Sequence, residues 1–179
     1  RLSAFVTDVD RHDPFRKKML PEVAAMFRTL APYAGTGLRY VFENLWLFKG
    51  LLTKLMPKIS AQGAAMLKTT IAFTMQSGSD AVNVMPQEAS VSANMRFIPH
   101  QGMDESLDII KNRAEKYGLS MDIMHANDYT ESIDINGAAF HMVQDVISKT
   151  FPGVAGSPYV MTGATDARCY QEICDNIVR

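Results

Sequence analysis

The chain has 179 residues, of which 47% are hydrophobic and 21% charged, a globular composition that excludes a disordered or collagen-like chain. Its formal net charge of -1 gives no overall electrostatic reason to bind nucleic acid or a membrane, so we expect neither partner. Two cysteines, Cys169 and Cys174, are too few for a disulfide framework and favour free thiols in an intracellular, cytoplasmic protein.

Both ends of the sequence interrupt a pattern. The chain begins at Arg1 without the charged and apolar segments of a signal peptide. We therefore expect a fragment of a longer protein. The most apolar stretch, residues 45–56, contains Lys49 and Lys54 and is shorter than the roughly 20 apolar residues that span a membrane.

Residues 1–67 are expected to be helical. Asp13 and Pro14 form a start signal for a helix over residues 15–30, which Pro21 should interrupt or kink. After a break at residues 31–37, a second helix is expected over residues 38–56. Because that helix is apolar on several sides, we expect neighbours to pack on more than one of them. A short third helix covers residues 60–67.

At Lys68 the apolar period changes to two, which predicts strands near residues 68–75 and 88–98. Ile71, Phe73 and Met75 share one face of the first strand. In the second, Met95 and Arg96 lie on opposite faces. A helix over 104–117 and a strand over 119–125 follow. With one strand missing ahead of the chain, this order completes a β-α-β-β-α-β unit.

From about residue 129 the order becomes strand, helix, strand, helix, strand, which indicates part of an α/β layer. We expect strands over 129–135 and 157–161, and helices over 139–150 and 165–173. A domain boundary is placed at about residues 126–130, where the sequence is polar.

No metal-ligand spacing, glycine-rich phosphate loop or nucleophile elbow is present in the sequence. Four histidines are scattered along the chain at positions His12, His100, His125 and His141. The scattered histidines favour structural or surface roles over a ligand set, and Ser-His-Asp catalysis stays open from the residues alone.

Three stretches are more distinctive. Asn83 precedes an X-Pro bend, where it could present its amide or make an ordinary turn. Arg96 lies on the polar face of its strand, where it could bind a carboxylate or be a solvated charge. Residues 161–170 run from a small-residue loop into a helix start that could bind an anion. There Thr165 or Asp166 could instead be a plain N-cap.

Taken in order, residues 83–89, 93–99 and 163–168 resemble the second half of a di-zinc metallopeptidase of the aminoacylase, glutamate carboxypeptidase and carboxypeptidase S type. Residues 44–48 and 151–154 are most similar to the carboxypeptidase S-like branch. The resemblance implies an α+β fold. Residues 1–126 would be a lid or dimerisation domain with a helical insert at 13–67 and a four-stranded antiparallel sheet whose first strand is missing. Residues 127–179 would be part of an α/β zinc-peptidase catalytic domain.

The resemblance also implies a function, namely zinc-dependent cleavage of an amide bond in a peptide or N-acyl amino acid with a free carboxylate. By similarity, the substrate-binding residues are Asn83, Arg96, Thr165, Asp166 and Arg168. Two zinc ions would activate a water molecule, with all their ligands and all catalytic residues outside this sequence, so the resemblance implies no metal site and no catalytic residue within this chain. A homodimer would form through the lid, and the isolated fragment would be inactive.

Two departures from the family pattern, Met95 and Cys169, leave the fine specificity open. An alternative is a non-catalytic oligomerisation module that pairs through a sheet edge or through the helix at 38–56. An unrelated α+β ligand-binding domain is a further alternative.

Overall fold

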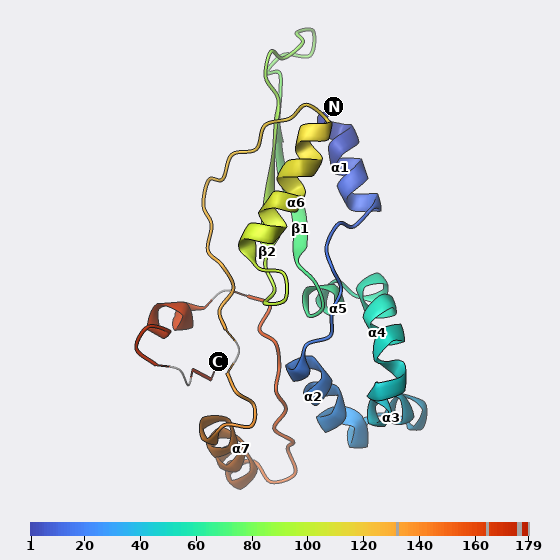
Figure 1. Cartoon of the computed structure of the whole chain (residues 1–179), viewed down its shortest axis with the longest axis vertical. Coiled ribbons are helices and arrows are strands. Elements are labelled where there is room, and N and C mark those ends of the chain that lie inside the picture. The colour runs from blue at the N-terminus through green and yellow to red at the C-terminus, as the bar shows by residue number, and fades with distance from the viewer. Residues whose placement is uncertain (132, 164, 175–176, 179) are drawn as a thin grey trace. The chain divides into compact units, whose positions relative to one another are not determined.

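The computed structural model describes residues 1–131, 133–163, 165–174 and 177–178 (Figure 1). These residues form two compact units. The first consists of Arg1–Arg16 and Lys68–Tyr129, and the second of Lys17–Leu67 and Thr130–Arg179. The α+β class predicted from the sequence is confirmed, because helices pack against a small antiparallel sheet in the first unit.

The first unit is a β-hairpin with two helices on one face (Figure 1). Its strands are β1 (Thr70–Ser77) and β2 (Ser90–Arg96), and its helices are α1 (Leu2–Arg11) and α6 (Met103–Lys116). Apolar residues of both helices pack together and against one face of the hairpin. They are Phe5, Val9, Ile110 and Ala114, joined by Ile71, Phe73 and Met95 from the strands.

A β-bulge between Phe73 and Met75 changes which side chains face the helices. Phe73 pairs with Ala93, but Met75 pairs with Ser92. Since adjacent strand residues point to opposite faces, the extra residue turns Met75 to the other face, where it is exposed. The predicted common face of Ile71 and Phe73 is confirmed, but the placement of Met75 beside them is wrong, because a bulge shifts the alternation by one residue.

Of the three strands of this sheet predicted within the chain, two are found among the described residues. The strands predicted over 119–125, 129–135 and 157–161 do not form there; Ser132 lies outside the described residues. Leu119 and Met121 nevertheless pack against the helix layer on alternate positions. Alternation therefore predicted how these side chains pack, whereas a strand also needs a backbone partner, which segment 119–125 lacks in the described part of the chain.

The helices of residues 17–67 begin and end differently from the prediction. The first is α2 (Pro21–Leu30), with Pro21 at its first position. The helix predicted over 15–30 therefore starts six residues late, because the residue before a proline is restricted to extended backbone and Leu20 adopts it. Asp13 accepts the Phe15 backbone N–H in a short turn instead of capping a helix.

The helix predicted over 38–56 is two helices, α3 (Thr36–Glu43) and α4 (Leu45–Ile59), separated at Asn44. The Asn44 side chain donates to the Tyr40 carbonyl at 2.8 Å, a local bond that competes with a continuous helix. Phe27 of α2 contacts Phe42 of α3, with ring centroids 4.8 Å apart. The short α5 (Ala61–Ala65) follows, capped by the Ser60 hydroxyl, which accepts the Gly63 N–H.

Helix α4 is packed on one side only. Leu45 is 2% exposed, but most other large apolar side chains of this helix are partly or largely exposed. The prediction that neighbours cover more than one side is wrong for the described part of the chain, where α3 and α5 contact this helix and a row of its apolar side chains stays exposed. Within the residues that the structure describes, no helix combines the length and hydropathy needed to cross a bilayer.

Residues 130–179 contain α7 (Ala138–Thr150), which confirms the helix predicted over 139–150. The helix predicted over 165–173 is instead the short 3-10 helix η2 (Asp166–Tyr170). Helix α6 confirms the helix predicted over 104–117, and Gly118 follows it with a φ of 66°. This left-handed conformation suits glycine and ends the helix.

Candidate substrate-binding residues and the turn after β2

Arg96 is the last residue of β2 and lies on the face of the hairpin opposite to the helices. Its neighbour Met95 packs against the helix layer, so the alternation of strand side chains directs Arg96 the other way. Thr70 is its cross-strand partner, and Asn94 shares its face. Arg96 is exposed, and its planar guanidinium can form two parallel hydrogen bonds to a carboxylate.

Asn83 lies in the loop of residues 78–89 that joins the two strands, and its side chain is exposed. This loop extends beyond the ends of the strands in Figure 1. Arg96 pairs with Thr70 at the opposite end of the ladder, whereas Ser77 and Ser90 pair next to the loop. Strand geometry therefore separates Arg96 from the loop by roughly 20 Å. The structure does not bring Asn83 and Arg96 together within one chain.

The remaining predicted residues cluster in the second unit. Thr165 precedes η2, and Asp166 and Arg168 lie within it, both exposed. The Thr165 hydroxyl is buried and has no hydrogen-bond partner among the described residues. Ala164, in the middle of the predicted motif, lies outside the described residues. The helix start that was predicted to bind an anion is therefore a single short 3-10 turn.

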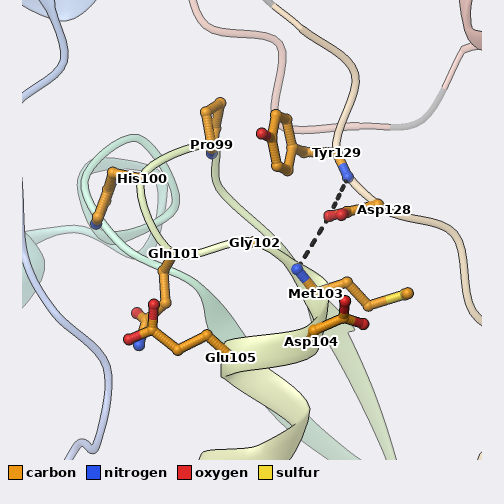
Figure 2. A pocket seen from close by; sticks show the side chains of 9 residues that line it. All are labelled: Pro99, His100, Gln101, Gly102, Met103, Asp104, Glu105, Asp128 and Tyr129. Atoms are coloured by element: carbon orange, nitrogen blue, oxygen red, sulfur yellow. Dashed lines mark hydrogen bonds between the residues drawn. The ribbon is translucent and has the colours of Figure 1, made fainter.

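A shallow pocket of about 310 Å³ lies at the start of α6 (Figure 2). Its lining begins at Pro99, three positions after Arg96 in the sequence. One oxygen of the Asp128 carboxylate accepts the backbone N–H groups of Met103 at 3.0 Å and Tyr129 at 2.7 Å. An internal carboxylate therefore already occupies the positive end of this helix. Asp104 and Glu105 also line the pocket, so its charge disfavours a second carboxylate. We do not assign substrate binding to it.

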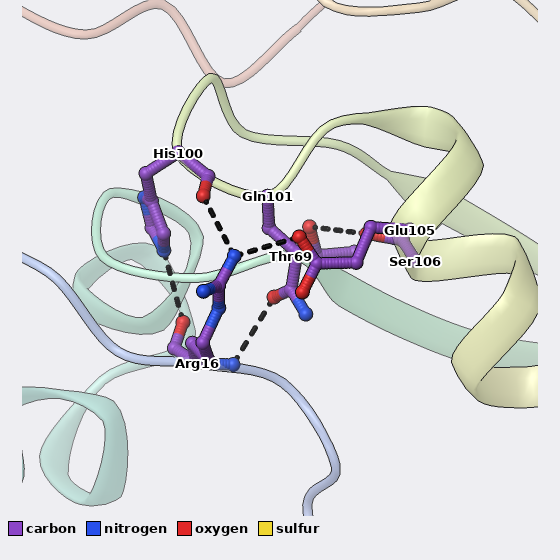
Figure 3. Close-up of polar contacts among 6 residues, drawn as sticks. All are labelled: Arg16, Thr69, His100, Gln101, Glu105 and Ser106. Atoms are coloured by element: carbon purple, nitrogen blue, oxygen red, sulfur yellow. Dashed lines mark hydrogen bonds and ion pairs between the residues drawn. The ribbon is translucent and has the colours of Figure 1, made fainter.

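The turn between β2 and α6 is fixed by side chains from a distant part of the chain (Figure 3). Arg16 donates to the His100 carbonyl at 3.1 Å and to Glu105 at 2.7 Å. In return, Nε2 of His100 donates to the Arg16 carbonyl at 3.0 Å. The Arg16 backbone N–H donates to Gln101, which is 4% exposed. These bonds hold the segment that follows Arg96, which makes them positioning contacts.

Beneath this turn, the buried hydroxyls of Thr69 and Ser106 are 3.1 Å apart and share a hydrogen bond. Thr69 immediately precedes β1, and Ser106 lies in the first turn of α6. Lys68, the residue before Thr69, forms an ion pair with Asp13, with 2.8 Å between nitrogen and oxygen. No local pattern in the sequence predicts this network, since its members are far apart along the chain and belong to no local motif.

Shifted pKa values occur in the helix layer. The hydrogen bond from His12 at 2.8 Å lowers the pKa of Asp8. Partial burial acts in the opposite direction, and the charge of Arg113 lowers this pKa further. Burial and then the nearby Asp8 charge raise the pKa of Tyr117. These groups connect α1 and α6, where Arg113 also donates to the carbonyl of His12 at 2.7 Å. Their contacts link the two helices.

The described residues offer no set of metal ligands. Among them, no three side chains of histidine, cysteine, aspartate or glutamate converge as a metal site. The zinc implied by the resemblance therefore does not fit any set of donors in the described part of the chain. We derive no metal chemistry from these residues.

Comparison with known proteins identifies the class of protein to which this hairpin-and-helix unit belongs. The family described as "Peptidase dimerisation domain" matches residues 21–122, which is more than half of the chain. The chain belongs to this M20 peptidase dimerisation family, which confirms the resemblance to the metallopeptidases drawn from the sequence motifs.

Particular relatives support the same assignment. The chain is 28% identical over 155 residues to the "N-fatty-acyl-amino acid synthase/hydrolase PM20D1" of Xenopus tropicalis, covering 86% of this chain and 30% of the relative. It is 25% identical to the "Probable carboxypeptidase S-like 2" of Dictyostelium discoideum, covering 99% of this chain and 34% of the relative. The chain thus spans about a third of the length of these relatives. No solved structure matches the chain significantly.

Proposed function

We propose that this chain forms the lid of a zinc-dependent amidohydrolase that cleaves an amide bond in a peptide or N-acyl amino acid with a free carboxylate. Membership of the peptidase dimerisation family supports the lid assignment. The two kinds of relative are named for N-fatty-acyl-amino acids and for a carboxypeptidase-like protein. N-acyl amino acids and peptide C-termini share one chemical feature, the free carboxylate.

The observation that carries the proposal is the position of Arg96. An exposed guanidinium on the helix-free face of the hairpin can form a bidentate pair with the substrate carboxylate. The network around Arg16, His100 and Gln101 fixes the turn that follows Arg96. Preorganisation of this kind lowers the entropy that binding must overcome. In this proposal Thr165, Asp166 and Arg168 are further substrate contacts.

The proposal includes a homodimer formed through the lid. Asn83 and Arg96 lie at opposite ends of the hairpin, roughly 20 Å apart by strand geometry. One chain therefore cannot direct both side chains at a single small carboxylate. If both contact the same substrate, they come from two copies of the chain, which gives the dimerisation a direct part in substrate binding.

Zinc, when bound in the whole enzyme, would supply an activated water molecule for attack on the amide carbonyl. The proposal places the zinc ligands and the general base outside the 179 residues. This chain contributes binding and orientation of the carboxylate end of the substrate. Correct orientation of the scissile amide then follows from anchoring the other end of the molecule.

Hydrolysis assays on the whole protein that carries this chain test the proposal. We expect release of the free amino acid from an N-acyl amino acid, complete loss of the activity after dialysis against EDTA, and its recovery on addition of zinc. Activity that persists after removal of metal would contradict the metal-dependent mechanism. A whole protein with bound zinc and no amide hydrolysis would instead favour the non-catalytic oligomerisation module.

A further inference from the structure

Helix α4 carries a second apolar ridge that no described part of the chain covers. Its packed side is formed around Leu45, Phe48 and Leu52. On another side, four apolar residues at intervals of four are 42% to 79% exposed, and they are Leu47, Leu51, Leu55 and Ile59. Residues four apart are neighbours on a helix surface, and each step of four turns by about 40° at 3.6 residues per turn, so these side chains form one exposed row that winds slowly around the helix, called the leucine ridge below.

A basic ridge runs beside the leucine ridge. Lys54 and Lys58 follow Trp46 and Gly50 at the same interval of four, which places all four in the row next to the leucine ridge. Trp46 is 81% exposed. The helix contains three lysines and no acidic residue. Long lysine side chains can lie along apolar surface while their ammonium groups reach a polar phase.

Charge is divided unevenly along the chain. Residues 17–67 contain seven lysines and arginines against two glutamates, whereas the remainder contains eleven basic against seventeen acidic residues. The net charge of -1 therefore conceals a basic helical segment. The expectation of no membrane partner was based on the total charge of the chain. Because the charge is unevenly distributed, the total does not describe the basic helical segment.

We propose that the leucine ridge and the lysines beside it dock α4 on an anionic lipid surface, with the helix lying in the plane of the interface. A helix with apolar residues on one side, lysines along the boundary and an exposed tryptophan suits such a surface. The helix is too short to span a bilayer. A single row of side chains offers less area than the roughly 800 Å² that each partner buries in a standard protein interface. This favours lipid over a second copy of the chain.

The test uses the full 179-residue chain and vesicles of equal parts phosphatidylcholine and phosphatidylserine, with pure phosphatidylcholine vesicles for comparison. Trp46 is the sole tryptophan of the chain, so its emission reports directly on α4. We expect co-flotation with the anionic vesicles, a blue shift of the Trp46 emission and weaker binding at high salt. Absence of co-flotation, or equal binding to both vesicle types, would overturn the proposal.

Two variants separate the apolar and the electrostatic contributions. Leu51→Glu should weaken vesicle binding by about tenfold or more, because it removes a buried leucine from the lipid-bound state. The double variant Lys54→Glu, Lys58→Glu should weaken binding to anionic vesicles by about tenfold or more, since each lysine contributes electrostatic attraction near the surface. Both sites are exposed, and circular dichroism checks that the helices persist.

Matched controls lie outside the insert. Met142→Glu changes an exposed apolar side chain of α7, and Lys111→Glu reverses an exposed charge of α6; both should leave vesicle binding unchanged. Analytical ultracentrifugation examines the competing occupant. If Leu51→Glu abolishes a concentration-dependent dimer while the wild-type chain ignores vesicles, the ridge binds a second copy and the lipid proposal is wrong.

Discussion

The two helical regions of this chain use similar sequence patterns in different ways. In the first unit, α1 and α6 pack their apolar sides on the hairpin, and Arg113, Arg16 and Thr69 add polar bonds between distant segments. In residues 17–67, helix α4 packs one side around Leu45 and leaves the leucine ridge exposed. An apolar helical pattern therefore locates a helix without determining how many of its sides are covered.

The difference bears on function. The first unit holds Arg96 on a fixed strand beside a turn with bonded side chains, as expected of a lid that orients a substrate. The leucine ridge exposes apolar surface that folding of this chain does not use, as expected of a docking surface. Substitutions that remove the same kind of side chain from the two kinds of environment can test this contrast.

The largest effect is expected in the core of the first unit. Phe5→Ala removes a ring that makes edge contacts with Phe73 at 5.8 Å and Tyr117 at 6.0 Å between centroids. We expect a loss of about 3–5 kcal/mol in the free energy of unfolding, measured in urea. Phe151→Ala, at an exposed phenylalanine, should cost less than about 1 kcal/mol. Equal losses would show that the α1–α6 layer is not the stable core.

The next prediction compares two leucines of the same helix. Leu45→Ala removes a buried side chain and should cost about 2–5 kcal/mol. Leu51→Ala removes a side chain that is 54% exposed and should cost less than about 1 kcal/mol. Urea unfolding of both variants measures the difference. If Leu51→Ala is as costly as Leu45→Ala, the leucine ridge is covered within the chain and is not a surface.

A smaller effect is expected at the hydroxyl pair beneath the turn after β2. Thr69→Val leaves the buried Ser106 hydroxyl without this partner, which should cost about 1–3 kcal/mol of unfolding free energy. Thr53→Val, which removes an exposed hydroxyl bonded to the Lys49 carbonyl, should change it by less than about 0.5 kcal/mol. The double variant Thr69→Val, Ser106→Ala should recover part of the loss; no recovery would point to packing instead.

The smallest effect concerns pH. Because the native pKa of Asp8 is lowered from 3.8, chiefly by the His12 hydrogen bond, its ionised form stabilises the fold. That contribution is fully present above the unfolded pKa of 3.8 and is lost as the pH falls through the native pKa. Asp8→Asn should therefore flatten part of the acid decline in melting temperature. Identical acid profiles for wild type and Asp8→Asn would contradict this role.

Sequence patterns predicted elements whose cause is local. The period of two over residues 70–73 and 90–96, and the helix ending at Gly118, depend on neighbouring residues and are found in the structure. The bulge at Met75 and the unpaired segment 119–125 depend on partners across the sheet, so the pattern could not show them. Pro21 was noticed but given the wrong role, since proline can begin a helix as well as interrupt one.

The candidate site, like the fold, was predicted from the sequence only in part. The motifs located the family, and the comparisons confirm it. They also located Arg96 on the polar face of its strand, opposite to Met95, which the packing supports. They did not show that Asn83 and Arg96 lie at opposite ends of the hairpin, because sequence distance around a loop does not give distance in space. The Arg16 and Gln101 contacts join residues 85 positions apart and left no local signal.

The most direct test of the account is a comparison of Arg96→Ala with wild type, in the whole protein, on two substrates. One is an N-acyl amino acid, and the other is the same compound with its carboxylate converted to a carboxamide. We predict that Arg96→Ala lowers kcat/KM for the acid by roughly tenfold to a hundredfold, the effect of a charge-assisted hydrogen bond, and leaves kcat/KM for the amide nearly unchanged. An equal loss on both substrates would contradict the assignment of Arg96 as the carboxylate anchor.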